Sequence, residues 1–288
     1  MLFRSPDRVD LNLLNPDSIR QCIRQTNPRV IVNAAAYTAV DAAERDEATA
    51  RAVNADAVGI MSCEAKKIGA LVIHYSTDYV FDGSNKSPYE EADQPNPINV
   101  YGKTKLAGEE ALRNSGATHL IFRTSWVYST RRKNFLLTIL GLATEKEELS
   151  IVADQIGSPT CAADIAAATS RILAQFLKAQ QLNRVDDYIG TYHMTAAGQT
   201  SWHEFADTIL AFAHSGRKYP PWFTEATGGH PLVTTRVAPI STHQFGSPTL
   251  RPSYSVLSNS RLTRTFGISL AHWRTQLDDC FSLQRSVL

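Results

Sequence analysis

Apolar runs and helical segments alternate through the first two thirds of the chain. Residues 29–32, 70–75 and 118–123 are short apolar runs that end in polar residues, a pattern typical of buried parallel strands. Helices are predicted where apolar residues recur at helical spacing between glycine and proline stops. These predicted helices span residues 16–27, 46–68, 101–114, 134–143 and 162–177. A further short strand is predicted at residues 149–152. The alternation of strand and helix predicts the α/β class, with a doubly wound parallel sheet.

The pattern is less regular beyond residue 180. The elements predicted there are one strand and three helices, at residues 191–194, 201–213, 259–266 and 270–281. Residues 216–255 are rich in proline and glycine and predict irregular structure. We therefore expect a Rossmann-like domain at residues 1–180 and a smaller α+β substrate lobe at residues 181–288, with exchange of segments between the two lobes allowed.

Composition excludes several classes of function. The 288 residues include 29 Lys and Arg against 28 Asp and Glu, so no net field would recruit nucleic acid or an anionic membrane. The sequence has no apolar run of 18 residues and no signal-peptide core, and we expect a cytoplasmic protein. The four cysteines lack C-x-x-C spacing, which argues against a zinc site or a disulfide framework.

Candidate catalytic residues lie at the start of one predicted helix and the end of one predicted strand. Tyr101 and Lys105 are four residues apart, so a helix places them on the same face. A fixed ammonium near the phenol would lower its pKa and make it a better acid at neutral pH. Thr77 follows the strand at residues 70–75 and could polarise a carbonyl group. Taken alone, the Tyr–Lys pair is weak evidence, because most pairs at this spacing are surface contacts.

The end of the first predicted strand is unusual for its three consecutive alanines, Ala34, Ala35 and Ala36. Small side chains at a strand end let a flat ligand approach the backbone, and open α/β sheets bind ligands at this edge. Helix propensity that runs on past the strand explains the alanines equally well. Asp41 and Glu44, a few residues later, are expected on a solvated helix face.

Five motifs follow one another in a fixed order along the chain. They are N-A-A-A-Y-T-A-V-D at 33–41, H-Y-S-T-D-Y-V-F-D-G at 74–83, N-V-Y-G-K-T-K-L-A-G-E at 99–109, F-R-T-S-W-V-Y at 122–128 and D-Q-I-G-S-P-T at 154–160. In this order they resemble the extended short-chain dehydrogenase/reductase superfamily and, within it, the dTDP-4-dehydrorhamnose reductase family. The resemblance runs from about residue 10 to near the end of the chain, and the smaller lobe shares it at residues 192–206 and 251–262.

This resemblance implies a reaction and a set of roles. Hydride would pass from NADPH or NADH to the C4 keto carbon of dTDP-4-dehydro-L-rhamnose, a step of nucleotide-sugar and polysaccharide biosynthesis. Tyr101 would be the proton donor, Lys105 would hold the nicotinamide ribose and lower the Tyr101 pKa, and Thr77 would complete the catalytic trio. The residues that would border the cofactor are Ala34, Ala35, Ala36, Tyr37, Thr38, Tyr101 and Lys105. Those that would bind the nucleotide sugar are Thr77, Asp78, Tyr79, Asn99, Trp126 and Arg251.

Two features depart from the family pattern. Members begin with a strand and a glycine-rich turn that cradles the cofactor pyrophosphate, whereas the first glycine here is Gly59. We expect a sheet without its first strand, weak nicotinamide binding and a lower stability than a complete relative. The second departure is the run S-T-R-R-K at residues 129–133, where relatives usually have glycine.

Other interpretations stay open at this point. The chain could be a non-catalytic regulatory subunit of the methionine adenosyltransferase type, or another nucleotide-sugar reductase or epimerase. Trp126 could simply fill the core, and Arg251 with Pro252 could form a plain turn. The intact Thr77, Tyr101 and Lys105 favour an enzyme, because a docking protein has no physical need for them. The expected partner is a small nucleotide sugar, and a homodimer is a possible assembly.

Overall fold

Four parallel strands form the central sheet of the computed structural model, which describes residues 4–7, 9–182 and 184–282. The strands lie in the order β1-β2-β3-β8, and all three pairings are parallel. Their bounds are β1 (Val30–Asn33), β2 (Leu71–Thr77), β3 (His119–Thr124) and β8 (Gly190–His193). In the register Asn33 faces His74 and Thr77 faces Thr124, so polar residues from successive strands meet at the carboxyl edge.

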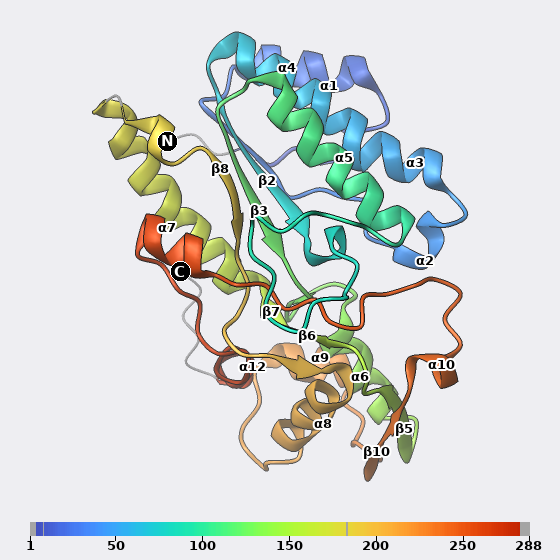
Figure 1. Cartoon of the computed structure of the whole chain (residues 1–288). Helices are drawn as coiled ribbons and strands as arrows, with labels where there is room; N and C mark the ends of the chain where they lie inside the picture. Colours follow the sequence, from blue (N-terminus) through green and yellow to red (C-terminus); the bar gives the residue numbers. More distant parts are fainter. Residues whose placement is uncertain (1–3, 8, 183, 283–288) are drawn as a thin grey trace.

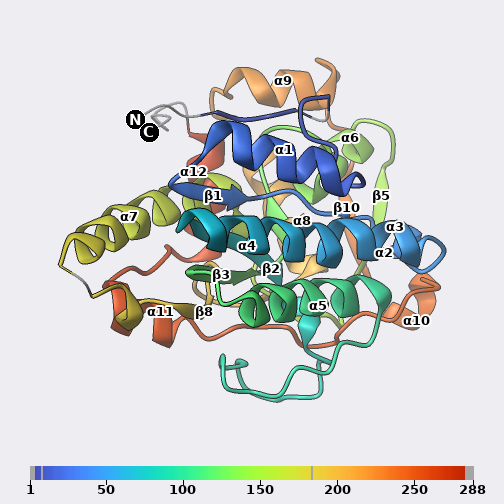
Figure 2. The same cartoon turned by 90° about the horizontal axis from the view of Figure 1, so that it is seen from above.

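Helices cover both faces of this sheet (Figures 1 and 2). On one face α4 (Ala57–Ile68) packs beside α5 (Val100–Ser115), and α1 (Pro16–Thr26) packs against α4. On the other face lie α7 (Ala162–Gln181) and α11 (Ser260–Phe266). Side chains alternate between the faces along each strand: Val72 joins the cluster under α4 and α5, and its neighbour Ile73 joins the one under α7. The predicted doubly wound α/β fold is confirmed.

Local sequence signals set the ends of the helices that carry the site. Asn15 caps α1, because its side chain accepts a hydrogen bond from Asp17 N at 2.9 Å. Gly69 and Gly116 end α4 and α5 in the left-handed region, with φ of 66° and 68°. The predicted helix at residues 46–68 is one rod that begins with α3 (Glu47–Arg51) and passes through a π-helical turn (Ala52–Asp56) into α4.

A second hydrophobic cluster lies below the carboxyl edge of the sheet (Figure 1). It is formed by α6 (Phe135–Ala143), β5 (Glu148–Val152), α8 (Trp202–Ala213), α9 (Pro221–Thr227), β10 (Arg236–Ile240) and α12 (Trp273–Phe281). The strand predicted at residues 149–152 pairs with β10 and lies outside the central sheet. The stretch predicted to be irregular, residues 216–255, contains α9, β10 and the short helix α10 (Thr242–Phe245).

The two clusters exchange segments. The strand predicted for the smaller lobe is β8, the fourth strand of the central sheet, where Arg123 of β3 faces His193. In the opposite direction, α6 and β5 precede residue 180 but belong to the second cluster. The domain boundary at residue 180 stays a prediction, and these elements cross it.

Short pairings connect the sheet with the second cluster. Residues Val127–Tyr128 (β4) pair with Thr160–Cys161 (β7), and Ile156–Gly157 (β6) pairs antiparallel with Thr200–Ser201 (β9). The turn Asp78–Val80 continues from β2 as one turn of 3-10 helix, and another such turn spans Val185–Asp187. The four-residue helix α2 (Val40–Ala43) follows β1. These connections bring the loops after β1, β2 and β3 together with the C-terminal segment.

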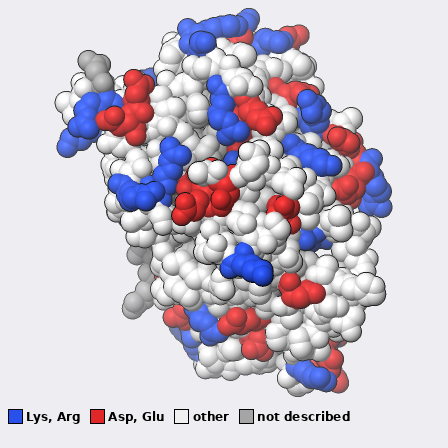
Figure 3. All heavy atoms as spheres, viewed as in Figure 1, with Lys and Arg blue, Asp and Glu red and all other residues white. Residues whose placement is uncertain are grey.

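Positive and negative side chains are interspersed on the face in Figure 3, in keeping with the net charge of +1. No helix among residues 4–7, 9–182 and 184–282 is long and apolar enough to cross a membrane.

Candidate active site

Thr77 and Asp78, at the end of β2, form the centre of a buried polar group. The Thr77 hydroxyl donates to Asp78 Oδ1 at 3.0 Å and accepts from Tyr79 N at 3.1 Å. Asp78 also accepts from Ser125 Oγ at 3.0 Å, and Ser255 of the C-terminal segment bonds to the same carboxyl. Burial raises the pKa of Asp78 to about 6, although these hydrogen bonds oppose the shift. Sequence reasoning missed the two serines.

Tyr101 meets Thr77 at this position. The Thr77 side chain lies close enough to the Tyr101 hydroxyl to affect its pKa, so the predicted phenol and alcohol converge. Burial raises the pKa of Tyr101 to about 12; the Thr77 side chain opposes this shift, and the charge of Asp78 adds to it. Burial thus has the largest effect on the Tyr101 pKa in this structure, and the expected lowering by Lys105 stays a prediction. At neutral pH the phenol keeps its proton, as a proton donor must.

Lys105 lies one turn further along α5 and is 2% exposed. Its Nζ donates to the carbonyl oxygen of Tyr75 at 2.7 Å and lies 3.3 Å from Nε2 of His74. Burial lowers the pKa of Lys105 to about 8 and that of His74 well below its ordinary value. The ammonium is thus directed at the backbone of β2, next to the strand end that carries Thr77.

The N-terminus of α5 is held by two residues, which fixes Tyr101. Asn99 Oδ1 accepts from Gly102 N at 2.8 Å as the N-cap, and Asn99 Nδ2 donates to Leu250 O at 2.9 Å. Glu44 Oε1 accepts from Val100 N at 2.8 Å. Asn99, predicted to contact the substrate, therefore has a capping role in this structure. Glu44, expected only on a solvated face, positions the catalytic helix.

The predicted cofactor loop is open at the end of β1. Ala34, Ala35 and Thr38 are exposed, and Ala36 and Tyr37 are partly buried. Asn54, in the π-helical turn, fixes the loop by accepting from Tyr37 N at 2.8 Å and donating to Tyr37 O at 3.1 Å. Small exposed side chains beside Lys105 and Tyr101 suit the nicotinamide half of a dinucleotide, because a flat ring can reach the backbone there. The residues present therefore fit this half of the cofactor.

Arg251 reaches the site from the C-terminal segment. Its Nη2 donates to Asp41 Oδ1 at 2.7 Å, and its Nη1 donates to the Ser247 hydroxyl. The guanidinium also lies near the Tyr79 side chain, whose ring packs edge-on against Tyr101 with 5.9 Å between ring centres. Burial raises the pKa of Tyr79. The structure thus places Arg251 and Tyr79 beside the catalytic residues and gives Asp41, expected to be merely solvated, an ion pair.

Trp126 directly follows Ser125 and has an unusual backbone conformation. Its φ of 47° is in the left-handed region, which a bulky residue rarely adopts. Its ring stacks on Trp202 with 3.5 Å between ring centres and 5° between planes. The indole is only partly buried. Trp126 is thus a member of a tryptophan pair at the edge of the site, and nothing in the sequence pattern pointed to Trp202.

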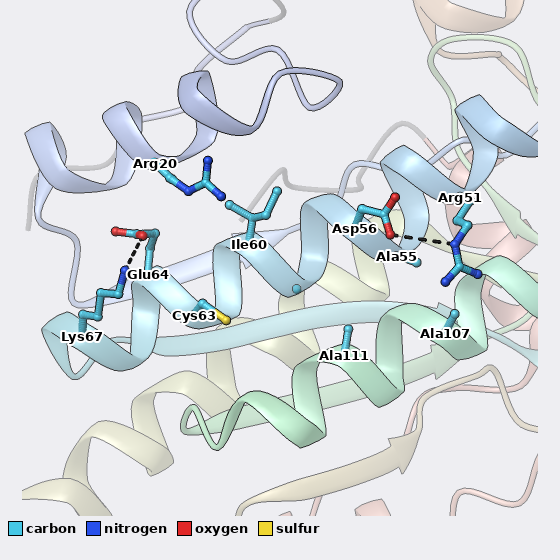
Figure 4. A pocket seen from close by; sticks show the side chains of 11 residues that line it. Arg20, Arg51, Ala55, Asp56, Ile60, Cys63, Glu64, Lys67, Ala107 and Ala111 are labelled. Carbon is cyan, nitrogen blue, oxygen red and sulfur yellow. Dashed lines mark hydrogen bonds and ion pairs between the residues drawn. The ribbon is translucent and has the colours of Figure 1, made fainter.

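A surface hollow of about 450 Å³ lies elsewhere, between α1, α4 and α5 (Figure 4). Gly59, Ala107 and Ala111 line it together with charged side chains such as Arg51 and Asp56. None of the predicted site residues is among its lining residues. The candidate active site, at the carboxyl edge of the sheet, is thus separate from this hollow. Among the described residues, no group of three His, Cys, Asp or Glu side chains could hold a metal ion.

Comparisons with known proteins agree with this geometry. The family described as "RmlD substrate binding domain" matches residues 1–285. The chain is 47% identical to dTDP-4-dehydrorhamnose reductase of Burkholderia thailandensis, over 95% of this chain and 88% of the relative. A crystal structure of the Bacillus anthracis reductase in complex with NADP superposes with a TM-score of 0.83, at 33% identity, over 96% of this chain and 88% of that one.

A second solved structure, an orthologous reductase from Clostridium acetobutylicum, has a TM-score of 0.82 at 32% identity, over 98% of this chain and 90% of that one. The family matches nearly the whole chain, and the Burkholderia thailandensis relative is 47% identical, so the comparisons agree with the sequence motifs and with the fold. This chain belongs to the dTDP-4-dehydrorhamnose reductase family, within the extended short-chain dehydrogenase/reductase superfamily.

Proposed function

We propose that this chain reduces the C4 keto group of dTDP-4-dehydro-L-rhamnose to give dTDP-L-rhamnose, with NADPH or NADH as the reductant, in nucleotide-sugar and polysaccharide biosynthesis. The observation that carries the proposal is that Thr77 and Tyr101 meet at the carboxyl edge of the sheet, with Lys105 one helical turn away. The relatives named as reductases support the substrate, and the relative solved with NADP supports the cofactor.

The chemistry requires donors where negative charge develops. As the carbonyl carbon is reduced, its oxygen becomes an alkoxide and needs both stabilisation and a proton. Tyr101 is neutral at physiological pH, because burial raises its pKa to about 12, so it can supply that proton. Thr77 lies beside this phenol, and its hydroxyl, which donates to Asp78 Oδ1 here, can turn to donate to the carbonyl oxygen. Both groups are held on rigid elements, so little reorganisation is needed during the reaction.

The nicotinamide cofactor supplies the hydride when bound. Lys105 and the loop of Ala34, Ala35, Ala36, Tyr37 and Thr38 would hold its nicotinamide end. Lys105 is the single buried cation on this face of α5, and its three donors exceed the two contacts that it makes in the described structure. A ribose hydroxyl is a suitable acceptor for the remaining donor.

The sugar nucleotide would be bound from the second side of the site. Arg251 offers a planar cation suited to a diphosphate. Asp78 and Tyr79 lie beside Tyr101, and Asn99 and Trp126 stand at the borders of the same region. A homodimer is the assembly to test, and the scattered cysteines support a reducing compartment such as the cytoplasm.

The direct test is to incubate the purified chain with NADPH and dTDP-4-dehydro-L-rhamnose and to follow cofactor oxidation together with product formation by NMR. We expect one dTDP-L-rhamnose for each NADPH consumed. Conversion of a nucleotide sugar without net cofactor consumption would instead indicate an epimerase. No turnover, combined with binding to a partner enzyme, would support the regulatory-subunit interpretation.

A further inference from the structure

The tryptophan pair at the edge of the site is clamped on both sides. Trp202 covers one face of the Trp126 indole, with 3.5 Å between ring centres. Gly157 covers the other face: a Cβ added there would lie 2.4 Å from Cε2 of Trp126, and 2.6 and 2.7 Å from Nε1 and Cζ2, which are bonded to Cε2. Because the central atom is the nearest of the three, the Gly157 backbone lies over the ring and not beside its edge. The space on that side admits glycine alone.

The backbone builds this clamp from three separate segments. The β6 and β9 pairing sets Gly157 opposite Thr200, so that Trp202, two residues later, lies close to Gly157. Phe135 of α6 supports Trp202 from behind, with 4.5 Å between ring centres. Trp126 itself is held in the left-handed region. A strained backbone persists only where its surroundings enforce it, and such positions occur often at functional sites.

The clamp is connected to the catalytic residues from both sides. Ser125, the neighbour of Trp126, donates to Asp78, which bonds to Thr77. The side chain of Ser255 also contacts the Asp78 carboxyl. The backbone N–H of Ser255 donates to the carbonyl oxygen of Ile156, which precedes Gly157. A displacement of Trp126 or of Gly157 would therefore move a hydrogen-bond partner of the Asp78 carboxyl, which lies beside Tyr101.

We propose that Trp202 is a positioning residue for sugar recognition: together with Gly157 it holds the Trp126 indole so that its edge, and not its face, meets the sugar ring. This inference rests on the proposed function and assigns one more residue to it. Both faces of Trp126 are covered, so the part of this partly buried indole that remains for the sugar ring is its edge. The sugar subsite, and not the nucleotide subsite, depends on the clamp.

The binding test compares dTDP-L-rhamnose with dTDP by calorimetry, for the full chain and for three variants. Trp202→Leu and Gly157→Ala should each weaken the binding of dTDP-L-rhamnose by about ten-fold and leave the affinity for dTDP unchanged. The interaction energy of an aromatic pair corresponds to about that change in affinity. Trp202→Phe, which keeps an aromatic ring against Trp126, should restore most of the affinity. Retained dTDP binding also shows that each variant is folded.

The second readout asks whether the clamp persists with ligand bound. The Nε1–H resonances of the four tryptophans can be followed in labelled protein, with Trp126 assigned from Trp126→Phe. The ring current of Trp202 should shift the Trp126 signal upfield, and this shift should remain at saturating dTDP-L-rhamnose. Loss of this upfield shift on binding would overturn the proposal, because it would show that Trp126 no longer stacks on Trp202 when the sugar is bound. Equal weakening of dTDP and dTDP-L-rhamnose in Trp202→Leu, or no weakening of either, would also overturn it.

These measurements do not depend on turnover. Failure of the reductase assay would contradict the proposed function, whereas normal turnover with an intact sugar affinity in Trp202→Leu would contradict the clamp alone.

Discussion

Lys105 Nζ and the carbonyl oxygen of Tyr75 are 2.7 Å apart, so the catalytic helix α5 is joined by a buried ammonium to the strand that ends in Thr77. Desolvation lowers the pKa of Lys105 to about 8, since few groups compensate the buried charge. The role of this lysine is thus tied to its protonation state near physiological pH. The relationship also fixes Tyr101 relative to Thr77, because each lies on one of the two joined elements.

The first prediction concerns the pH dependence that Lys105 imposes. Activity that needs the ammonium should fall as pH rises above about 8, and the pH profile of kcat/KM measures this. Lys105→Arg should lose that inflection, because a guanidinium stays charged. A wild-type profile that is flat through this range would contradict the assignment.

Protein stability should show the opposite trend for the same group. The folded pKa of Lys105 lies below the ordinary 10.5, so the unfolded chain binds more protons between about 8 and 10.5. The contribution of Lys105 to the free energy of unfolding should therefore increase with pH in this window. Comparing denaturant unfolding of the wild type and Lys105→Met at several pH values isolates this contribution.

The second prediction concerns Asp78. Burial raises its pKa from 3.8 to about 6, so the unfolded chain releases this proton first as pH rises. The contribution of Asp78 to stability should decrease between about pH 4 and pH 6, by on the order of 3 kcal/mol in total. Asp78→Asn should remove this part of the pH dependence, while Asp17→Asn, at an exposed position, should not. Identical pH profiles for the wild type and Asp78→Asn would show that the carboxyl is not buried as described.

The third prediction compares a buried with an exposed ion pair. Arg123 donates twice to the fully buried Glu109, at 2.8 and 2.9 Å, whereas the side chain of Glu148, paired with Arg236, is 48% exposed. Glu109→Gln should destabilise the protein by about 3–5 kcal/mol, because it leaves a buried guanidinium without its counter-charge. Glu148→Gln, the same change at the surface, should cost less than about 1 kcal/mol. Similar unfolding free energies for the two variants would refute this difference.

The fourth prediction concerns the basic loop after β4. Arg132 has a φ of 59°, a left-handed conformation that costs free energy for any residue with a Cβ. Arg132→Gly should raise the free energy of unfolding by up to about 1 kcal/mol and leave kcat unchanged. Arg131→Gly removes the same charge at a position outside the left-handed region and should lower stability instead. Equal effects at the two positions would attribute the change to charge and not to backbone strain.

The sequence predicted the central sheet well because its signals are local. Apolar runs, the Asn15 and Asn99 caps and the Gly69 and Gly116 stops each act within a few residues, and the structure has helices and strands where they indicate them. The catalytic pair of Thr77 and Tyr101 could also be anticipated, because carboxyl ends of parallel strands meet at one edge. The short strand β5 was predicted as well, but its partner β10 lies far away in the chain.

Features that depend on distant contacts escaped prediction. The ion pair of Arg251 with Asp41 joins segments about two hundred residues apart, and the Trp126–Trp202 stack depends on the pairing of β6 with β9. The raised Tyr101 pKa depends on burial, which the spacing of Tyr and Lys on a helix does not reveal. Spacing along the sequence predicts which residues are neighbours within one helix or strand. The electrostatic environment of a residue depends on tertiary packing, which this spacing does not reveal.

The account rests on Tyr101 as the proton donor, and the fifth prediction tests it most directly. Steady-state reduction of dTDP-4-dehydro-L-rhamnose by NADPH should be measured for the wild type, Tyr101→Phe and Tyr188→Phe, a matched change at a partly buried position in the cluster under α7, away from the site. We predict that kcat falls by about 10²–10⁴-fold in Tyr101→Phe and is unchanged in Tyr188→Phe. A Tyr101→Phe variant with the wild-type kcat would contradict the account.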